Sequence, residues 1–214
     1  MVHLYIGKSR AHIHVHKTIL CRRVEYFDTM FNGGLKEEND NSVYFPEDDI
    51  ESFDLLMEWI YTDTLRPLSI VADDETEKTV SWDPIGLYIL AYRLCITKLS
   101  NRVMDCYRLL HVESNTRPSR RAISRVYSNA PVGSPIRLYC VQFLGYFILK
   151  FQEEEISSTS RMKNNDIYGL LWQNEDLGKD FITLIRGQGG KAPVDPRTLP
   201  RCFYHTHEAG ESCL

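Results

Sequence analysis

Three histidines at alternate positions, His12, His14 and His16, have the residue type and regular spacing of metal ligands. Along a β-strand their side chains project to one face, whereas Ile13 and Val15 project to the other. The apolar pair is expected to face the core, which leaves His12 and His14 on the solvent face. A zinc site needs three or four converging ligands, and no cysteine or carboxylate in this segment supplies the rest. The pattern therefore favours the exposed side of a strand over a metal site.

A second candidate lies in the C-terminal tail, where Cys202, His205, His207 and Cys213 follow a C-x2-H-x-H-x5-C spacing. Cysteine and histidine are ligands that zinc accepts in tetrahedral geometry. The alternative is a loose terminus with no packed core to position the ligands, and the single residue between the histidines is unusual for a zinc finger. Zinc at this tail is a hypothesis, and no other cofactor is expected.

Basic residues gather at Arg117, Arg120, Arg121 and Arg125, in the stretch "RPSRRAISRVY". Such a cluster near aromatic residues can contact nucleic acid. No zinc-finger array, basic leucine zipper or other reader accompanies it, and the formal net charge is −4. A solvated helix start is the favoured interpretation, and nucleic acid is not the expected partner.

Motifs for catalysis are missing. The sequence contains no G-x-S-x-G or H-E-x-x-H, and "GKS" at 7–9 lacks the earlier glycine of a phosphate-binding loop, because Val2 stands there. We therefore expect a protein that is not an enzyme.

The composition is that of a soluble globular protein, with 43% hydrophobic and 25% charged residues among 214. The longest apolar run, 136–151, is interrupted by Arg137, Gln142 and Lys150 and is too short for a bilayer span. The start "MVHLYIGKSR" does not resemble a signal peptide. Reduced thiols, a cytoplasmic or nuclear location and no membrane association are expected.

Hydrophobic periodicity predicts the elements of the first half of the chain. Period-two patterns at 2–6 and 11–15, separated by Gly7, indicate a β-hairpin. Two short helices should follow, stopped by "NGG" at 32–34, and then a polar acidic loop at 35–41 and a strand at 42–45. The clearest helix falls in 47–65, with an apolar face of Phe53, Leu56, Met57 and Ile60.

The remaining segments are predicted in the same way. They are an edge strand at 65–71, a solvated acidic loop at 72–83, helices at about 84–95 and 96–110, and a basic linker at 111–120. A helical part follows, with helices around Ile123 to Tyr127, at 136–151 and at about 164–186. The last 28 residues are too rich in glycine and proline for regular structure.

The order of these pieces resembles the BTB/POZ domain. The resemblance rests on a hairpin ending in "VHKTIL", on "YFDTMF", on an acidic-start helix ending in "WIYT", and on "LYILAYRLCITKLSNRVMDC". It covers about residues 2–110 and implies an α+β fold, a small mixed sheet with a helical cluster. The downstream "ISRVYSNAPVGSPIRLY" and the tail "CFYHTHEAGESC" look like those of a group of fungal BTB proteins with a helical C-terminal extension.

The resemblance implies binding to other proteins. One group of BTB proteins consists of substrate adaptors for cullin-type ubiquitin ligases, and a hydrophobic–any–Glu stretch contacts the cullin. Here Leu35, Lys36 and Glu37 occupy that place, although Leu35 packed locally and Glu37 solvated is the simpler alternative. A second reading is an oligomerising transcription or chromatin regulator with weak nucleic-acid contact. A homo-oligomer is compatible with the family, but Met1 takes the place of an acidic residue and no swapping element precedes it, which puts the swapped homodimer in doubt.

The predicted organisation is therefore a BTB/POZ domain at 1–110, a mostly helical extension at 111–190, and an irregular tail containing cysteine and histidine at 191–214. The predicted function is a non-enzymatic interaction module.

Overall fold

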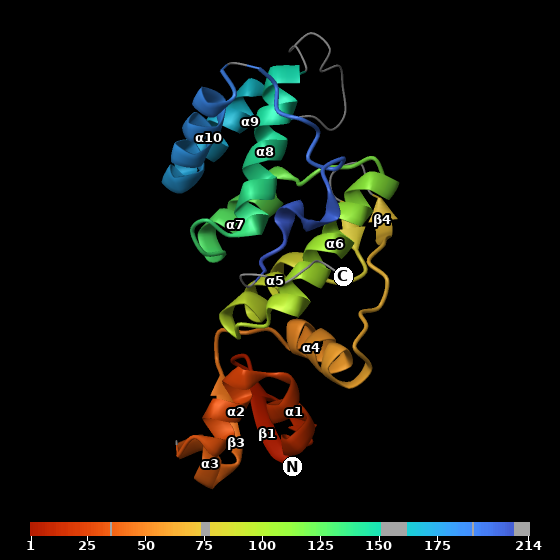
Figure 1. The fold of residues 1–214 in the computed structure, drawn as a ribbon, viewed down its shortest axis with the longest axis vertical. Helices are drawn as coiled ribbons and strands as arrows, with labels where there is room; N and C mark the ends of the chain where they lie inside the picture. The colour runs from red at the N-terminus through yellow and green to blue at the C-terminus, as the bar shows by residue number, and fades with distance from the viewer. Residues whose placement is uncertain (35, 74–77, 151–161, 190, 208–214) are drawn as a thin grey trace. The chain divides into compact units, whose positions relative to one another are not determined.

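The computed structural model describes the chain except residues 35, 74–77, 151–161, 190 and 208–214. Two compact units make up the chain (Figure 1). The first comprises Met1–Pro67 and Trp82–Val103, and the second comprises Leu68–Ser81 and Met104–Leu214. Each contains its own group of buried apolar side chains, so each is described by itself. The fold is α+β, with small sheets and mainly helical structure after residue 83.

Strand β1 (Val2–Ile6) is the central strand of a three-stranded sheet in the first unit. It pairs antiparallel with β2 (Ala11–Val15) and parallel with β3 (Ser42–Phe45). Gly7 begins the turn between β1 and β2 at a φ of +67°, a left-handed conformation that glycine adopts without a Cβ clash. The predicted hairpin and the predicted strand at 42–45 are thus confirmed.

The described residues of the first unit also form five helices before residue 94. They are α1 (Lys17–Arg23), α2 (Glu25–Asn32), α3 (Lys36–Asp40), α4 (Ile50–Thr62) and α5 (Pro84–Arg93). Helix α1 packs against α2 and α4, and α4 packs against α5.

Capping residues fix where the longer helices of this unit begin and end. The side chain of Asp49 accepts a hydrogen bond of 2.8 Å from the Ser52 amide at the start of α4. Asp83 accepts one of 3.1 Å from the Ile85 amide at the start of α5. Asp63 ends α4 in the left-handed conformation.

Aromatic residues from α2, β3 and α4 form the centre of this unit's core. The ring of Phe27 lies 6.3 Å from that of Phe31 and 6.1 Å from that of Phe45, and Phe45 lies 4.9 Å from Phe53. All four are buried, and so is Leu4 of β1. The predicted apolar face of α4 is confirmed, because Phe53, Leu56, Met57 and Ile60 are all buried.

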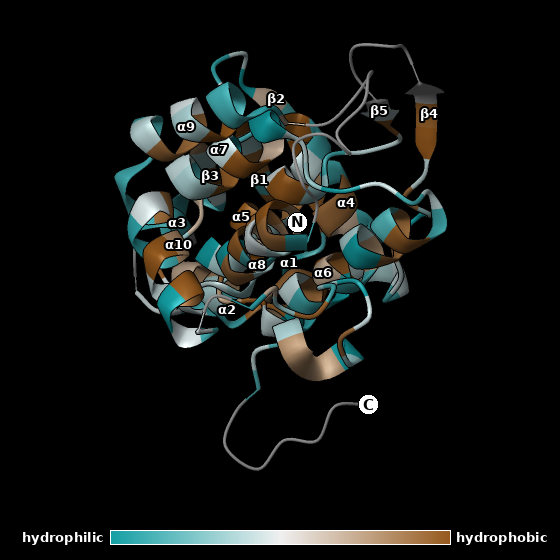
Figure 2. Cartoon of the chain, turned by 90° about the horizontal axis from the view of Figure 1, so that it is seen from above, coloured by the Kyte–Doolittle hydropathy of each residue, from teal (hydrophilic) through white to brown (hydrophobic). Residues whose placement is uncertain are grey.

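The second unit includes a two-stranded antiparallel sheet of β4 (Ile70–Asp73) and β5 (Lys78–Val80). The apolar residues of β4 show brown in Figure 2, and Val71 is 62% exposed. The boundary between the two units falls within α6 (Thr97–Glu113), between Val103 and Met104.

Helix α8 (Pro135–Lys150) is the central helix of the second unit, and contacts α7 (Arg120–Asn129) and α10 (Glu175–Gly187). It carries a buried arginine, Arg137, whose side chain donates to two backbone carbonyl groups and pairs with an aspartate carboxylate at 2.9 Å. Helix α9 (Asn164–Gln173) contacts α7 and α10. Within the described residues, no helix has the length and apolar character needed to cross a membrane.

The tail is packed against the second unit. Arg108 of α6 donates hydrogen bonds to the backbone carbonyls of Leu199, Pro200 and Arg201, and its guanidinium lies 4.9 Å from the ring centre of Tyr204. Tyr204 is fully buried and belongs to a short 3-10 helix, η2 (Arg201–Tyr204), which packs against α8.

Three predicted elements differ from the structure. The acidic segment after residue 35 contains the helix α3 and is not a simple loop. The strand predicted at 65–71 begins only at Ile70, and its partner β5 lies inside the segment predicted as a solvated loop. The single helix predicted at about 164–186 is two helices, interrupted at Asn174.

Candidate functional site

The predicted partner-binding stretch lies at the start of α3. Leu35 is outside the described residues, whereas Lys36 is exposed and Glu37 is half-buried. Helix α3 packs against α2 and β3. The stretch therefore belongs to a helix that the rest of the first unit supports, although its role in binding stays a prediction.

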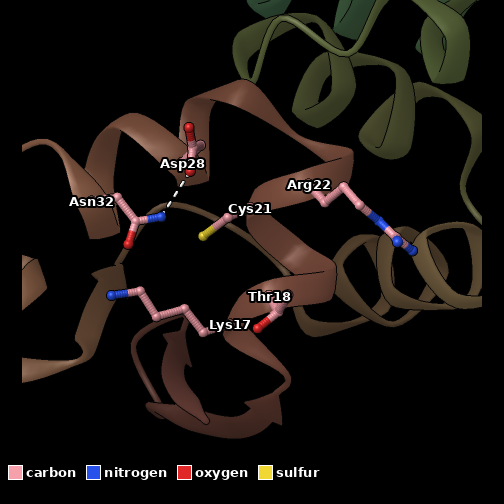
Figure 3. Close-up of a pocket in the computed structure, with 6 residues that line it drawn as sticks. All are labelled: Lys17, Thr18, Cys21, Arg22, Asp28 and Asn32. Carbon is pink, nitrogen blue, oxygen red and sulfur yellow. Dashed lines mark hydrogen bonds between the residues drawn. The ribbon is translucent and has the colours of Figure 1, made fainter.

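A shallow open groove runs between α1 and α2, with a volume of about 640 Å³ (Figure 3). Its lining is polar: Lys17 donates a 2.7 Å hydrogen bond to the carbonyl of Phe31, and Asn32 donates one of 2.7 Å to the Asp28 carboxylate. Desolvation raises the pKa of the Cys21 thiol in this groove. A protonated thiol is a weak nucleophile, so Cys21 is poorly suited to nucleophilic catalysis.

His16 and Lys17, at the junction of β2 and α1, have structural roles. The His16 ring shares a 2.8 Å hydrogen bond with the hydroxyl of Tyr61 on α4, and Lys17 connects α1 to the end of α2. These contacts join the hairpin to the helices at the "HK" pair of the sequence.

The family comparison agrees with this arrangement of hairpin, helices and short strand. A family model of the BTB/POZ domain matches residues 2–80. The chain contains a BTB/POZ domain. No curated protein matches the chain. The match ends at Val80, so the predicted boundaries at 110 and 190 stay predictions.

BTB/POZ domains mediate interactions between proteins, and this chain accordingly carries a protein–protein interaction module. The match does not distinguish a cullin adaptor from a transcription regulator.

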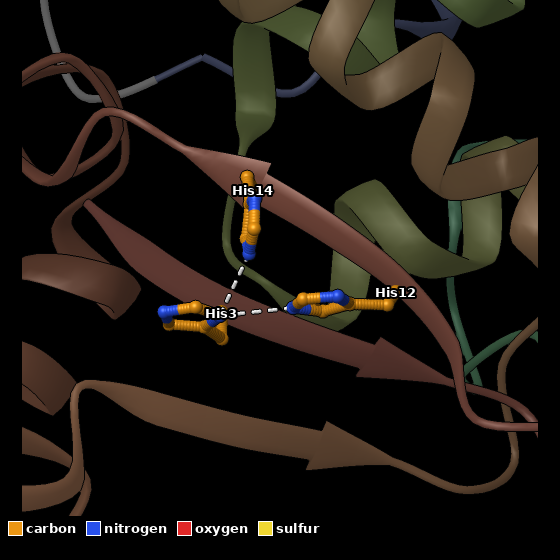
Figure 4. Close-up of side chains that lie close together, drawn as sticks. All are labelled: His3, His12 and His14. Atoms are coloured by element: carbon orange, nitrogen blue, oxygen red, sulfur yellow. Dashed lines mark hydrogen bonds between the residues drawn. The ribbon is translucent and has the colours of Figure 1, made fainter.

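Three histidines meet on the exposed face of the BTB/POZ domain's hairpin (Figure 4). His12 and His14 are exposed, as predicted, and β1 adds His3 between them. The Nε2 atoms of His12 and His14 each lie 2.9 Å from Nδ1 of His3. The third ring comes from a different strand, whereas His16, the third histidine of the sequence pattern, points to Tyr61.

Proximity changes the acid–base behaviour of this cluster. Partial desolvation lowers the pKa of His12, and the nearby His14 and His3 lower it further. Protonating all three rings would bring like charges together. His12 thus favours the neutral imidazole, the form that binds metals.

The residues of the predicted tail site are brought together in part. Cys202, His205 and His207 each place one potential ligand atom within 4.8 Å of the others, whereas Cys213 lies outside the described residues. Cys202 is part of a disulfide, contrary to the expectation that the thiols are reduced. Cys21, Cys95, Cys106 and Cys140 are reduced and form no disulfide.

Arg117 and Arg120 of the basic stretch each contact a side chain of the second unit. The guanidinium of Arg117 lies 4.5 Å from the ring centre of Phe147, and Arg120 pairs with Asp166 at 2.9 Å. Arg121 and Arg125 are exposed on α7. The contacts of Arg117 and Arg120 are thus structural, and the solvated helix start stays a prediction.

Two functional neighbours were missed from the sequence. His3 precedes the histidine pattern by nine residues, and only the antiparallel register opposite His14 brings it near. Asp105 contacts His205 at 2.9 Å from 100 positions earlier. The period-two pattern of 2–6 was a usable signal for the first contact, but no local pattern signals the second.

Proposed function

We propose that this chain is a non-enzymatic substrate adaptor whose BTB/POZ domain docks onto a cullin-type scaffold. The observation that carries the proposal is the half-buried Glu37 at the start of α3, directly after Leu35 and Lys36, in a chain with a BTB/POZ match. A carboxylate held by a helix is a better anchor for a partner than one on a free loop, because less side-chain entropy is lost on binding. Such a role places the protein in the cytoplasm, the nucleus or both.

The chemistry of the thiols supports a non-enzymatic role. Burial strongly raises the pKa of Cys140, and desolvation raises that of Cys21. Catalytic cysteines need the opposite, a pKa lowered by nearby positive charge. Cys21 and Cys140 are therefore suited to packing.

The adaptor proposal is tested by reversing one charge. Glu37→Lys should weaken binding of the full chain to purified cullin by about tenfold or more, since a charged partner loses its counterpart and meets a like charge. Titration calorimetry measures the dissociation constant directly. The matched control is Glu47→Lys, the same charge change at an exposed position between β3 and α4, which should leave binding unchanged.

Equal affinity for wild type and Glu37→Lys would remove this contact surface from the proposal. Absence of any cullin binding by the folded wild-type chain would remove the adaptor function itself.

The second candidate, a regulator that touches nucleic acid, is favoured by one observation, the exposure of Arg121 and Arg125 on α7. Two exposed arginines supply little of the phosphate contact that specific DNA-binding proteins use. The adaptor is therefore the preferred proposal.

A further inference from the structure

The tail cluster has the spacing of a metal site. Cys202, His205 and His207 present ligand atoms within 4.8 Å of one another. Around zinc, with bonds of about 2.0–2.3 Å, tetrahedral ligand atoms lie roughly 3.3–3.8 Å apart. Small side-chain movements are enough to close the cluster around one ion.

The backbone that carries these ligands is anchored, which removes the objection that a loose terminus could not position them. Arg108, only 7% exposed, binds three successive carbonyls that end at Arg201, directly before Cys202. Tyr204, directly before His205, is fully buried, and its hydroxyl donates to the side chain of Gln142 on α8. The ligands therefore extend from a packed framework.

His205 has the outer partner that metal-binding histidines commonly have. Its Nε2 lies 2.9 Å from Oδ1 of Asp105, and the two side chains are 4% and 14% exposed. The other carboxylate oxygen of Asp105 pairs with Arg201 at 2.6 Å. A carboxylate behind a histidine fixes the tautomer and orients the ring so that Nδ1 binds the metal.

His207 supplies an independent observation. Its Nε2 is buried and has no hydrogen-bond partner within the described residues. An unsatisfied buried polar group costs about 1–3 kcal/mol. A bond to a metal ion satisfies such a nitrogen and removes this cost.

We propose that the tail, in its reduced state, binds one Zn²⁺ through Cys202, His205 and His207. Thiolate and imidazole ligands together select zinc over magnesium or calcium, which prefer oxygen. Binding displaces the proton of the Cys202 thiol, and the resulting thiolate offsets part of the charge of the ion.

In the structure Cys202 is oxidised to a disulfide, and a disulfide sulfur cannot bind zinc as a thiolate does. A phosphine reductant cleaves the disulfide bond to two thiols. One water and one phosphine are consumed, two thiols form, and the phosphine becomes its oxide. Metal binding should therefore be measured on phosphine-reduced protein.

The test compares zinc content in variants of the full chain after reduction, zinc loading and desalting. Because the hairpin histidines could also hold metal, every protein carries His3→Asn, His12→Asn and His14→Asn. This reference should retain one zinc per chain by mass spectrometry, and adding Cys202→Ser should remove it. The control Cys106→Ser, which changes a half-exposed reduced cysteine of the same unit, should retain it.

Equal zinc contents in the reference and the Cys202→Ser protein would overturn the proposal. A second measurement needs no substitution. In reduced wild-type protein, zinc should slow alkylation of Cys202 by iodoacetamide at least tenfold and leave the exposed Cys95 unaffected. Unchanged alkylation of Cys202 would equally overturn it, and would leave a disulfide as the bond that this cysteine forms.

Discussion

At the scale of single residues, His111 is the most strongly perturbed of the described histidines. Its side chain is buried, its Nδ1 shares a 2.8 Å hydrogen bond with the Tyr139 hydroxyl, and its ring stacks on that of Tyr139. Desolvation, with a smaller effect from the positive Arg197, lowers its pKa to about 3. The folded second unit therefore requires the neutral imidazole.

Acid should destabilise the protein through His111. The folded pKa lies below the unfolded value of 6.5, so this contribution is fully present above about pH 6.5 and is lost as the pH falls towards 3. Between about pH 7.5 and pH 5 the loss is about 2 kcal/mol. Urea unfolding followed by circular dichroism at the two pH values measures it.

The control for this prediction is His111→Gln, which is less stable throughout but should lack this part of the pH dependence. An identical pH dependence in the two proteins would show that His111 is not the titrating group. His12, whose pKa is also lowered, adds a dependence of the same sign, which His12→Asn subtracts.

Predictions for single residues were confirmed where the neighbours along the chain determine whether a side chain is exposed. The alternation of His12 and His14 with apolar residues predicted their exposure, and the structure confirms it. Contacts such as His205 with Asp105 depend on packing between distant segments, which no spacing encodes. The tail could be named as a metal candidate from its residue types, but its anchoring could not be predicted.

At the scale of elements, the attachment of the tail to α6 depends on Arg108. Arg108→Ala should lower the free energy of unfolding of the second unit by roughly 2–4 kcal/mol, because it leaves three tail carbonyls without their charged donor. Limited proteolysis should then cut the tail at lower protease concentration. Arg102→Ala, at an exposed position of the same helix, should change stability by less than about 0.5 kcal/mol.

Similar proteolysis of the Arg108→Ala and Arg102→Ala proteins would contradict this role for Arg108. It would mean that Tyr204 and its neighbours hold the tail without the arginine.

A strong apolar period predicted the existence of an element well, but it did not predict polar elements or a break between two helices. The hairpin and helix α4 have clear patterns and were predicted. Helix α3 consists of the polar residues "KEEND", and β5 of "KTV", so neither offers an apolar stripe. The break at Asn174 separates two helices whose apolar residues continue almost in phase, and periodicity alone joined them.

At the scale of the whole molecule, the net charge argues against binding to nucleic acid. With a formal net charge of −4, and with Arg117 and Arg120 in contact with Phe147 and Asp166, the chain should give no mobility shift with duplex DNA at about 0.15 M salt. A shift that weakens steeply with salt, and disappears in an Arg121→Ala, Arg125→Ala double variant, would instead favour the regulator function.

The family was predictable from the sequence because several motifs occur in a fixed order, and a family model independently matches residues 2–80. The structure adds that compactness divides the chain near residue 103, with the β4–β5 hairpin in the second unit. The β4–β5 segment lies inside the family match but groups with residues after 103. The order of the sequence motifs alone could not predict this grouping.

The contact between Arg108 and the tail also has a consequence for how the chain is made. The Leu199 carbonyl that Arg108 binds lies 91 residues further along the chain. At synthesis rates of about 5–20 residues per second, this partner emerges roughly 5–20 s after the arginine. The first unit can fold during that interval. The apolar helices of the second unit stay partly exposed until the tail is synthesised. During rapid heterologous expression, this chain should therefore aggregate before the synthesis of its tail is finished.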